Sequence, residues 1–303
     1  MLNRRKFLIG TGAAALGALV LPKSASAFFA EAGDHPIGLQ LFTLFNVIDA
    51  DVKGTLKKVA DTGYKEIESA FSKLPGYYGM KPKEFAALCS DLGLSWQSHH
   101  VLGAPFKLPP GTKLPKGLTL PPHMRNLKDD MQSLVDEAAE GGLPYLVCAN
   151  IPTDTLDDIK SSIEILNKTG ELCKKANIQF CYHNHDMEFK NVEGKIPYQM
   201  LLSDTQADLV KMELDLAWAT KAGIDPVEMF NSHPGRFPLL HVKDISKDFK
   251  TLLPVGEGVV DFKRIFANLQ NSGARHYFVE HDMAPDAFVS IATSYKNLRA
   301  LGV

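Results

Sequence analysis

Residues 178–185, Ile178-Gln179-Phe180-Cys181-Tyr182-His183-Asn184-His185, together with the segment 156–176 before them, decide the fold. Apolar residues recur at helical spacing over 156–176, which predicts an amphipathic helix. The helix ends at a short turn, Ala176-Asn177. The apolar run 178–183 then predicts a buried strand that ends in polar side chains. Helix, turn and strand together are one unit of an α/β fold.

The same unit repeats along the chain from Pro36 onward. Eight short apolar runs predict strands at residues 37–41, 66–69, 94–100, 145–149, 178–183, 210–215, 239–243 and 277–281. Segments between them carry helical spacing, for example 52–59, 85–92, 127–138, 156–176 and 262–269. This alternation builds an open doubly wound sheet or a closed barrel. No G-x-G-x-x-G turn follows the first strand, as a nucleotide-binding sheet would require. Eight repeats therefore predict a single (β/α)8 TIM barrel of the α/β class.

The composition is that of an ordinary globular protein. Of the 303 residues, 45% are hydrophobic and 22% are charged, which excludes a disordered, collagenous or small disulfide-stapled chain. The chain has 33 basic and 35 acidic residues and so creates no positive field for phosphate backbones. We therefore expect no nucleic-acid partner. The four cysteines lack C-x-x-C spacing and lie in apolar segments, which predicts buried free thiols.

The first 27 residues have the pattern of a secretory signal peptide. Arg4 and Arg5 come first, an apolar run rich in Gly and Ala follows over 9–21, and residues 25–27 (Ala-Ser-Ala) resemble a cleavage site. The run is too short for a permanent membrane anchor. The paired arginines resemble a twin-arginine signal, which predicts export of a folded protein to the periplasm. We expect a signal over 1–27 and a barrel over 28–303. Cleavage would remove four basic and no acidic residues and change the net charge from -2 to -6.

Residues 103–125 are the one long irregular segment of the chain after the signal, and they are rich in Pro, Gly and Lys. They follow the third predicted strand. In a TIM barrel the loops after strands lie at the C-terminal face, where active sites are built. We therefore expect this segment to cover the site as a lid.

Polar residues stand where the predicted strands end. They are Gln40, Glu68, His99, His100, His183, His185, Asp215, His241, Lys243 and Glu280. Six strand ends with a histidine or a carboxylate predict one common site. Imidazoles with two carboxylates suit a divalent cation, and the absence of cysteine argues against a structural zinc site. Simpler explanations exist: Asp215 can cap the following helix, and a histidine on an apolar strand can be a hydrogen-bonded core residue.

Seven short motifs follow one another in a fixed order. They are GLQLFT at 38–43, GYKEIE at 63–68, YHNHDMEF at 182–189, ELDLAW at 213–218, HVKD at 241–244, VGEG at 255–258 and VEH at 279–281. In this order they resemble the sugar phosphate isomerase/epimerase family, the xylose isomerase-like barrels, over nearly the whole chain after the signal. The resemblance implies a TIM barrel that holds one divalent metal ion, manganese, zinc or magnesium.

The resemblance places the metal ligands at His183, Asp215, His241 and Glu280. Epimerases of the family usually have glutamate where this chain has His183, and their two metal-bound glutamates exchange protons with opposite faces of the substrate. A histidine whose usable nitrogen binds a metal cannot act as a base. We therefore expect His185 or His100 to act beside Glu280 as catalytic residues. Whether His183 or His185 is the ligand from this strand stays open.

Five further positions are expected to contact the substrate: Gln40, Glu68, Trp218, Lys243 and Glu257. Lys243 would stabilise developing negative charge, and Trp218 would form an apolar wall for a sugar ring. Glu257, between two glycines, would bind sugar hydroxyls. The alternatives are a surface lysine, a tryptophan in the core, a tight turn at Glu257 and a solvated strand end at Glu68.

These residues predict a metal-dependent sugar isomerase or epimerase that removes the proton α to a carbonyl. The Tyr-His-x-His strand also resembles inosose dehydratase, so a lyase or eliminase that acts on a keto-sugar such as a 3-keto-glycoside is the first alternative. A non-catalytic carbohydrate-binding barrel is the second. The charge of -6 disfavours an abasic-site endonuclease. The expected partner is a small sugar or keto-sugar, and a homo-oligomer is left open.

Overall fold

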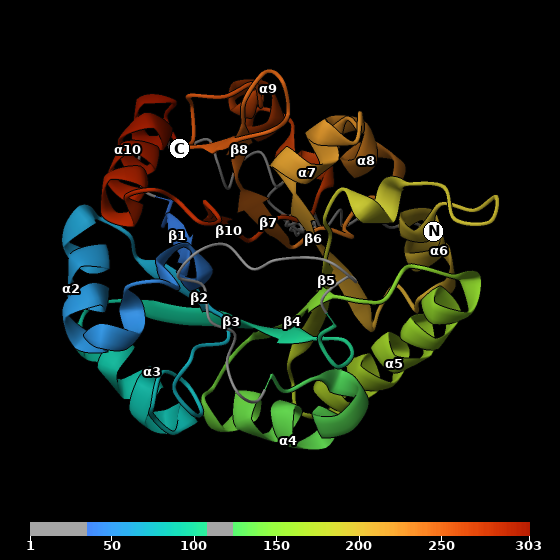
Figure 1. Ribbon diagram of the computed structural model, residues 1–303, viewed down its shortest axis with the longest axis horizontal. Coiled ribbons are helices and arrows are strands. Elements are labelled where there is room, and N and C mark those ends of the chain that lie inside the picture. The colour runs from blue at the N-terminus through green and yellow to red at the C-terminus, as the bar shows by residue number, and fades with distance from the viewer. Residues whose placement is uncertain (1–34, 108–123) are drawn as a thin grey trace, which may run out of the picture.

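Eight parallel strands close into a barrel in the computed structural model, which describes residues 35–107 and 124–303. Their order around the barrel is β1, β10, β7, β6, β5, β4, β3, β2. The strands are β1 (Gly38–Gln40), β2 (Glu66–Ser69), β3 (Ser95–Leu102), β4 (Tyr145–Asn150), β5 (Gln179–His183), β6 (Val210–Asp215), β7 (Leu239–Val242) and β10 (His276–Val279). The predicted α/β TIM barrel is confirmed (Figure 1). The predicted signal and most of the predicted lid lie outside the described residues.

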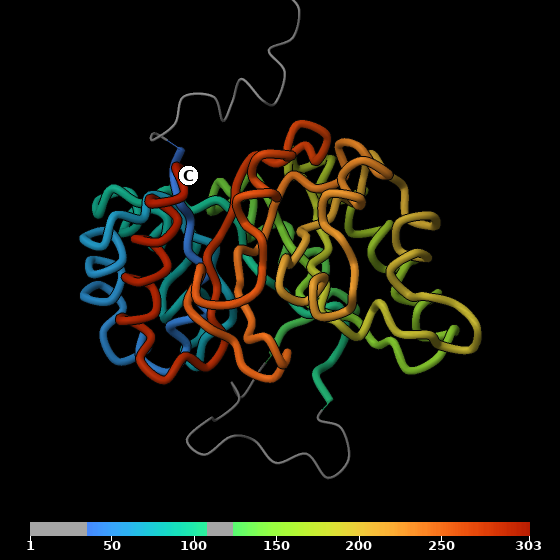
Figure 2. The backbone as a smooth tube through the Cα atoms, turned by 90° about the horizontal axis from the view of Figure 1, so that it is seen from above, coloured from blue at the N-terminus to red at the C-terminus, as the bar shows by residue number. Residues whose placement is uncertain are grey.

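Helices form a ring around the barrel (Figure 1). They are α2 (Val52–Thr62), α3 (Pro82–Asp91), α4 (Leu127–Glu140), α5 (Leu156–Lys175), α6 (Pro197–Asp204), α7 (Leu216–Lys221), α8 (Pro226–Ser232), α9 (Phe262–Phe266) and α10 (Ala287–Ala300). Helix α9 is shorter than the predicted 262–269, because a 3-10 turn, η4 (Leu269–Asn271), replaces its last part. Figure 2 shows the C-terminus beside the beginning of the described chain, and α10 packs against α2, so the last helix closes the ring against the first one.

Three strands, β1, β7 and β10, end earlier than predicted. After β1 the chain forms the 3-10 turn η1 (Leu41–Leu44), and the Gln40 side chain caps it by accepting the Phe42 N–H at 2.9 Å. After β7 a short strand β8 (Asp244–Ile245) pairs with β9 (Leu252–Leu253) in an antiparallel hairpin. Lys243 and Glu280 therefore stand just beyond the ends of β7 and β10.

An apolar layer fills the barrel below its C-terminal end. Val147, Cys181, Leu239 and Phe278 are fully buried and pack against one another. Gly38 permits this packing, because a Cβ atom at that position would overlap the Phe278 ring. The layer closes the barrel from below, so the polar side chains above it are enclosed and can reach solvent at the C-terminal mouth alone.

The four cysteines, Cys89, Cys148, Cys173 and Cys181, are buried free thiols, as predicted. Burial raises the pKa of each thiol above its ordinary value, which keeps the four sulfur atoms protonated and unreactive. Among the described residues, we find no helix with both the length and the apolar character needed to span a membrane.

Candidate active site

Residues from the ends of the barrel strands form one buried polar cluster at the C-terminal mouth. Its members are Glu68, His100, His183, Glu213, Asp215, His241, Lys243 and Glu280. Side chains alternate between the two sides of a strand, so Glu213 and Asp215 both point inward from β6 and occupy successive layers. Glu213 was not among the residues predicted for the site.

His241 lies between a lower and an upper layer of carboxylates. Its Nε2 atom is 2.7 Å from Oε1 of Glu68 and 3.1 Å from Oε2 of Glu213. Its Nδ1 atom is 2.7 Å from Oε2 of Glu280 and 3.9 Å from Oδ2 of Asp215. The lower carboxylates therefore fix the orientation of the ring and direct Nδ1 to the upper layer.

The lower layer is a closed hydrogen-bond network. Oε2 of Glu68 accepts the Ser98 hydroxyl at 2.6 Å, and Oε1 accepts the Gln40 amide at 2.7 Å. His100 joins the two carboxylates, because its Nε2 atom lies 2.7 Å from Glu213 and 3.1 Å from Glu68. Gln40 and Glu68 were predicted to contact the substrate, but both are completely buried and neither lines the mouth. They hold the neighbouring side chains of the site in place through hydrogen bonds.

The charges of the lower layer are balanced internally. Burial alone would lower the pKa of His100, but the carboxylates of Glu68 and Glu213 raise it to about 9. Burial and the charge of Glu68 raise the pKa of Glu213 to about 7. Burial would also raise the pKa of Glu68, yet the two neighbouring histidines, His100 and His241, hold it below its ordinary value. At neutral pH the layer thus pairs anionic Glu68 with cationic imidazole.

In the upper layer, Lys243 is completely buried and surrounded by carboxylates. Its Nζ atom lies 3.2 Å from Asp215, 2.6 Å from Glu280 and 2.9 Å from Asp282. Burial would lower the pKa of Lys243, but the charges of Asp215, Asp282 and Glu280 raise it well above its ordinary value. Lys243 therefore supplies the predicted positive charge at the site. Its partner Asp282 was not among the predicted site residues.

Four side chains of the upper layer can supply ligands to one metal ion. His183, Asp215, His241 and Glu280 each offer an atom within 4.8 Å of the others, and a second overlapping group combines His100, His183, Glu213 and His241. The first group consists of the four predicted ligands.

Two atoms of the first group make no hydrogen bond in the described structure, which tests the fit of a cation. Oδ1 of Asp215 accepts the Trp218 N–H at 2.9 Å and caps α7, as the alternative interpretation of this residue predicted. The other oxygen, Oδ2, is buried and accepts no hydrogen bond within the described residues, although Nζ of Lys243 lies 3.2 Å away. Nδ1 of His183 is also buried without a hydrogen bond, 3.3 Å from Oε2 of Glu213. A divalent cation would compensate both atoms, so the residues present fit a metal ion.

The remaining predicted residues lie at different distances from this centre. The ring of His185 is 4.9 Å from the ring of His183 and 6.1 Å from that of Trp218, and its side chain is 40% exposed at the mouth. Lys243 approaches the Trp218 ring to 5.2 Å. Glu257 is exposed in a turn, in which its N–H donates to the carbonyl oxygen of Pro254. It does not line the cavity at the mouth. The alternative interpretation of Glu257, a tight turn, agrees with this position.

The mouth itself is a small cavity of about 120 Å³. His100, His183, His185, Lys243, Glu280 and Asp282 line its polar side. Phe42, Phe71, Leu102 and Phe106 line its apolar side. A cavity with convergent polar groups on one wall and aromatic rings on the other is typical of a site for a small polar molecule.

The model of one protein family, described as the xylose isomerase-like TIM barrel, matches residues 56–296. The chain belongs to this family. A structure from the same fold, a sugar phosphate isomerase/epimerase from Parabacteroides distasonis, is 29% identical and superposes with a TM-score of 0.72 over 88% of this chain and 98% of that one. A xylose isomerase-like barrel from Mycobacterium smegmatis in complex with magnesium shares the fold at 16% identity, with a TM-score of 0.63 over 90% and 97% of the two chains.

Among curated proteins, this xylose isomerase-like barrel is similar to an inosose dehydratase from Lacticaseibacillus casei. The two are 26% identical over 153 residues, which is 45% of this chain and 51% of the relative. The match thus spans about half the length of that relative. Isomerases or epimerases and dehydratases both occur among the similar proteins, so membership of the family establishes an enzyme fold shared by both reaction types.

Proposed function

We propose that this protein is a divalent-metal-dependent enzyme that removes the proton α to the carbonyl of a small sugar or keto-sugar. The observation that carries the proposal is the buried group His183, Asp215, His241 and Glu280 beside the ammonium of Lys243. The group combines two imidazoles with two carboxylates, a donor set that suits a divalent cation, and it stands at the end of the barrel where TIM-barrel chemistry occurs.

The four residues of this group would hold the metal ion. A divalent cation bound there would act as a Lewis acid on the substrate carbonyl and make the adjacent C–H bond more acidic. His241 keeps a fixed orientation because Glu68 and Glu213 hold its Nε2 atom. Lys243 stabilises negative charge that develops on the substrate, since its ammonium group is buried at the edge of the same cavity.

His185 is the residue best placed to accept the α proton. Its ring lies at the mouth, is partly exposed and makes no hydrogen bond within the described residues, whereas Glu280 is held by both His241 and Lys243. One base on one side of the substrate favours elimination. His185 takes the α proton, the bond from the β carbon to the leaving oxygen breaks with its electron pair, and His185 returns the proton to that oxygen. The similarity to a protein named inosose dehydratase supports this outcome.

Isomerisation or epimerisation is the second candidate, because Glu280 lines the cavity together with His185. Two groups that reach the substrate from different sides can remove a proton from one face and return one to the other. The similarity to the Parabacteroides distasonis structure named sugar phosphate isomerase/epimerase supports it. A phosphorylated substrate is not proposed, because no Gly-rich phosphate-binding loop or cluster of arginines is evident in the sequence.

One experiment separates these outcomes. The metal-loaded protein is incubated in deuterated water with a 3-keto-glycoside and, separately, with simple ketoses. Release of the aglycone without deuterium incorporation into ketoses supports elimination. Incorporation into ketoses without release of aglycone supports isomerisation or epimerisation. Neither reaction, in a protein that purifies without a divalent ion, would overturn the enzyme proposal in favour of a carbohydrate-binding barrel.

We also propose that the protein is exported to the periplasm through residues 1–27. The support is the sequence pattern, with Arg4 and Arg5 before an apolar run. Cell fractionation tests it: the wild-type protein is expected in the periplasm, and the double variant Arg4→Lys, Arg5→Lys in the cytoplasm. Equal distribution of the two proteins would contradict a twin-arginine signal.

A further inference from the structure

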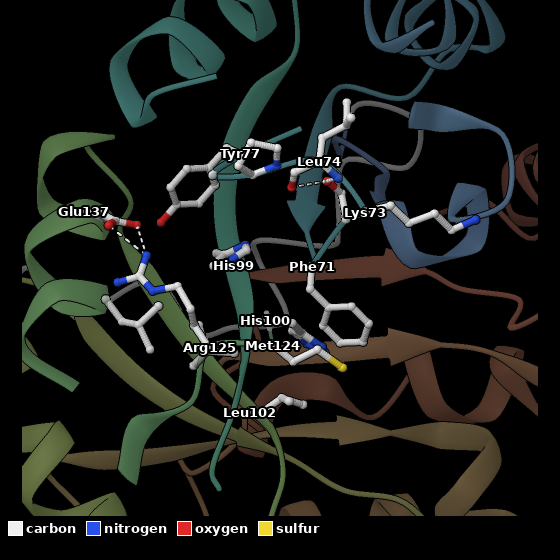
Figure 3. Close-up of a pocket in the computed structure, with 15 residues that line it drawn as sticks. Phe71, Lys73, Leu74, Tyr77, His99, His100, Leu102, Met124, Arg125 and Glu137 are labelled. Carbon is white, nitrogen blue, oxygen red and sulfur yellow. Dashed lines mark hydrogen bonds and ion pairs between the residues drawn. The ribbon is translucent and has the colours of Figure 1, made fainter. Parts of the chain in front are cut away.

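A second, larger cavity adjoins the mouth of the site. It has a volume of about 430 Å³ and lies between the segment 71–77 after β2, the end of β3 and the beginning of α4. Phe71, His100 and Leu102 line both this cavity and the mouth, so the two hollows meet at these three side chains. Figure 3 shows the larger cavity with Phe71 and His100 on its inner side.

The walls of this second cavity are mainly apolar and aromatic. Tyr77, Met124 and Leu134 contribute to them. The charged residues at its edge already interact with other side chains. Arg125 forms a bidentate ion pair with Glu137 at 2.6 and 2.7 Å. Lys73 points away from the cavity in Figure 3, with Nζ 5.0 Å from the centre of the Phe45 ring. No charge in the cavity is thus left for a charged ligand among the described residues.

Two polar groups of the cavity are available to a ligand. Nδ1 of His99 lies 2.8 Å from Oγ of Ser69, which accepts the Trp96 indole N–H at 2.7 Å. The Ser69 hydroxyl lies 3.3 Å from the Ser98 carbonyl oxygen as well, so it donates either there or to Nδ1. In both cases Nε2 of His99 is a polar atom without a hydrogen bond in the described structure. The Tyr77 hydroxyl is buried and also makes no hydrogen bond there. Its ring centre lies 4.8 Å from that of His99.

This balance of polar and apolar groups decides the class of ligand. A second sugar ring would bring several hydroxyl groups, and most of them would be buried without hydrogen bonds. An aromatic ring with one or two oxygen atoms would pack against Phe71 and Tyr77 and use the two free polar groups. The cavity adjoins the mouth at Phe71, His100 and Leu102, so it lies where a substituent of a sugar bound in the mouth would extend.

We propose that the second cavity binds an uncharged aromatic aglycone of the substrate, so that the natural substrate is an aryl glycoside in its keto form. The proposal rests on the proposed function, because it assigns the sugar part to the metal centre. It goes further, because it names the leaving group and the residues that select it.

The test measures binding and needs no turnover. Isothermal titration calorimetry compares 4-nitrophenyl β-glucoside with methyl β-glucoside on the metal-loaded protein. Neither glucoside has the ketone, so neither reacts. We expect the wild-type protein to bind the aryl glucoside at least tenfold more tightly. Met124→Trp, which fills the cavity from a partly exposed position, should remove this preference and leave the affinity for methyl β-glucoside unchanged. Leu134→Phe fills the cavity from α4 and should act in the same direction.

Met187→Trp is the matched control, because Met187 is 52% exposed on another loop and lines neither cavity. It should keep the wild-type preference. The proposal is overturned if the wild-type protein shows no preference for the aryl glucoside, including no binding of either compound, or if Met124→Trp and Leu134→Phe both keep the preference. A wild-type preference without any elimination from keto-glycosides would overturn the proposed reaction and keep the cavity assignment.

Discussion

Nε2 of His241 lies 2.7 Å from Oε1 of Glu68, although the two residues are 173 positions apart in the chain. This hydrogen bond holds the imidazole so that Nδ1 is directed to Glu280, 2.7 Å away. In metal sites the partner of the second imidazole nitrogen fixes the tautomer and orientation of the ligand. Glu68, which the sequence suggested as a substrate contact, is thus a positioning residue for a proposed metal ligand.

Glu68→Gln should weaken metal binding without removing a ligand. The amide keeps the size of the side chain but loses the charge that accepts from His241, and we expect the affinity for Mn²⁺ to fall about 10- to 100-fold. Calorimetric titration of the metal-free protein measures it. Glu66→Gln is the matched control: Glu66 is buried on the same strand but bonds His276 at 2.8 Å at the opposite end of the barrel. Equal losses in both variants would show that Glu68 has no specific role.

Asp215→Asn should abolish tight metal binding while leaving the fold intact. Asparagine caps helices about as well as aspartate, so the bond from the Trp218 N–H to the retained oxygen survives. The negative charge on the second oxygen is lost. Asp215→Ala should lose the metal as well, with an additional loss of about 1 kcal/mol of stability from the missing cap. Metal analysis and denaturant unfolding of the two metal-free variants check this. Full metal occupancy in Asp215→Asn would remove Asp215 from the ligand set.

Strand alternation explains why most of the barrel could be predicted, and the family resemblance supplied the four proposed ligands. His183, Asp215 and His241 stand at or near the ends of short apolar runs, and Glu280 follows another such run, where parallel strands of a barrel converge. Glu213 was missed because it lies one layer deeper, inside an apolar run and away from the strand end, although its spacing of two residues from Asp215 places both on the inward face. The partners of a buried residue, such as Glu68 for His241, depend on the closure of the barrel.

The second cavity could not be predicted for a related reason. Its walls combine the outward side of β3 with a loop and a helix, and local spacing does not place these elements together. Glu257 is a case in which the sequence alone leaves two interpretations. A glutamate between two glycines is compatible with a ligand-binding loop and with a plain turn, and the structure has the turn.

The contributions of Glu213 and His100 to the stability of the metal-free protein should fall as the pH rises from about 5 to 9. Glu213 has its pKa raised from 4.5 to about 7, so the folded protein holds a proton that the unfolded chain releases between these values. His100, raised from 6.5 to about 9, does the same at higher pH. Both contributions are present at low pH and are lost as the pH increases. The loss from Glu213 is on the order of 3 kcal/mol at about 1.4 kcal/mol per pKa unit.

Urea unfolding of the metal-free protein at a series of pH values measures this slope. In Glu213→Gln the side chain cannot titrate, so the decline between pH 5 and 7 should become shallower. Glu164→Gln, at an exposed position of α5, is the control and should keep the wild-type slope. Equal slopes of stability against pH in the wild type and in Glu213→Gln would contradict the assigned protonation of Glu213.

His185→Gln should reduce turnover and leave the metal bound. The glutamine keeps a polar side chain at the mouth but cannot accept and return a proton, and loss of a general base typically costs about 10²- to 10⁴-fold in kcat. His185 is also the alternative to His183 as the ligand from β5, so the metal content decides between the two roles. His233→Gln, on the outer side of the barrel at the end of α8, is the control and should behave as wild type in both measurements. If His185→Gln loses the metal together with the activity, His185 is the ligand. In that case, the base must be sought at Glu280 or His100, the two other predicted catalytic residues that line the same cavity.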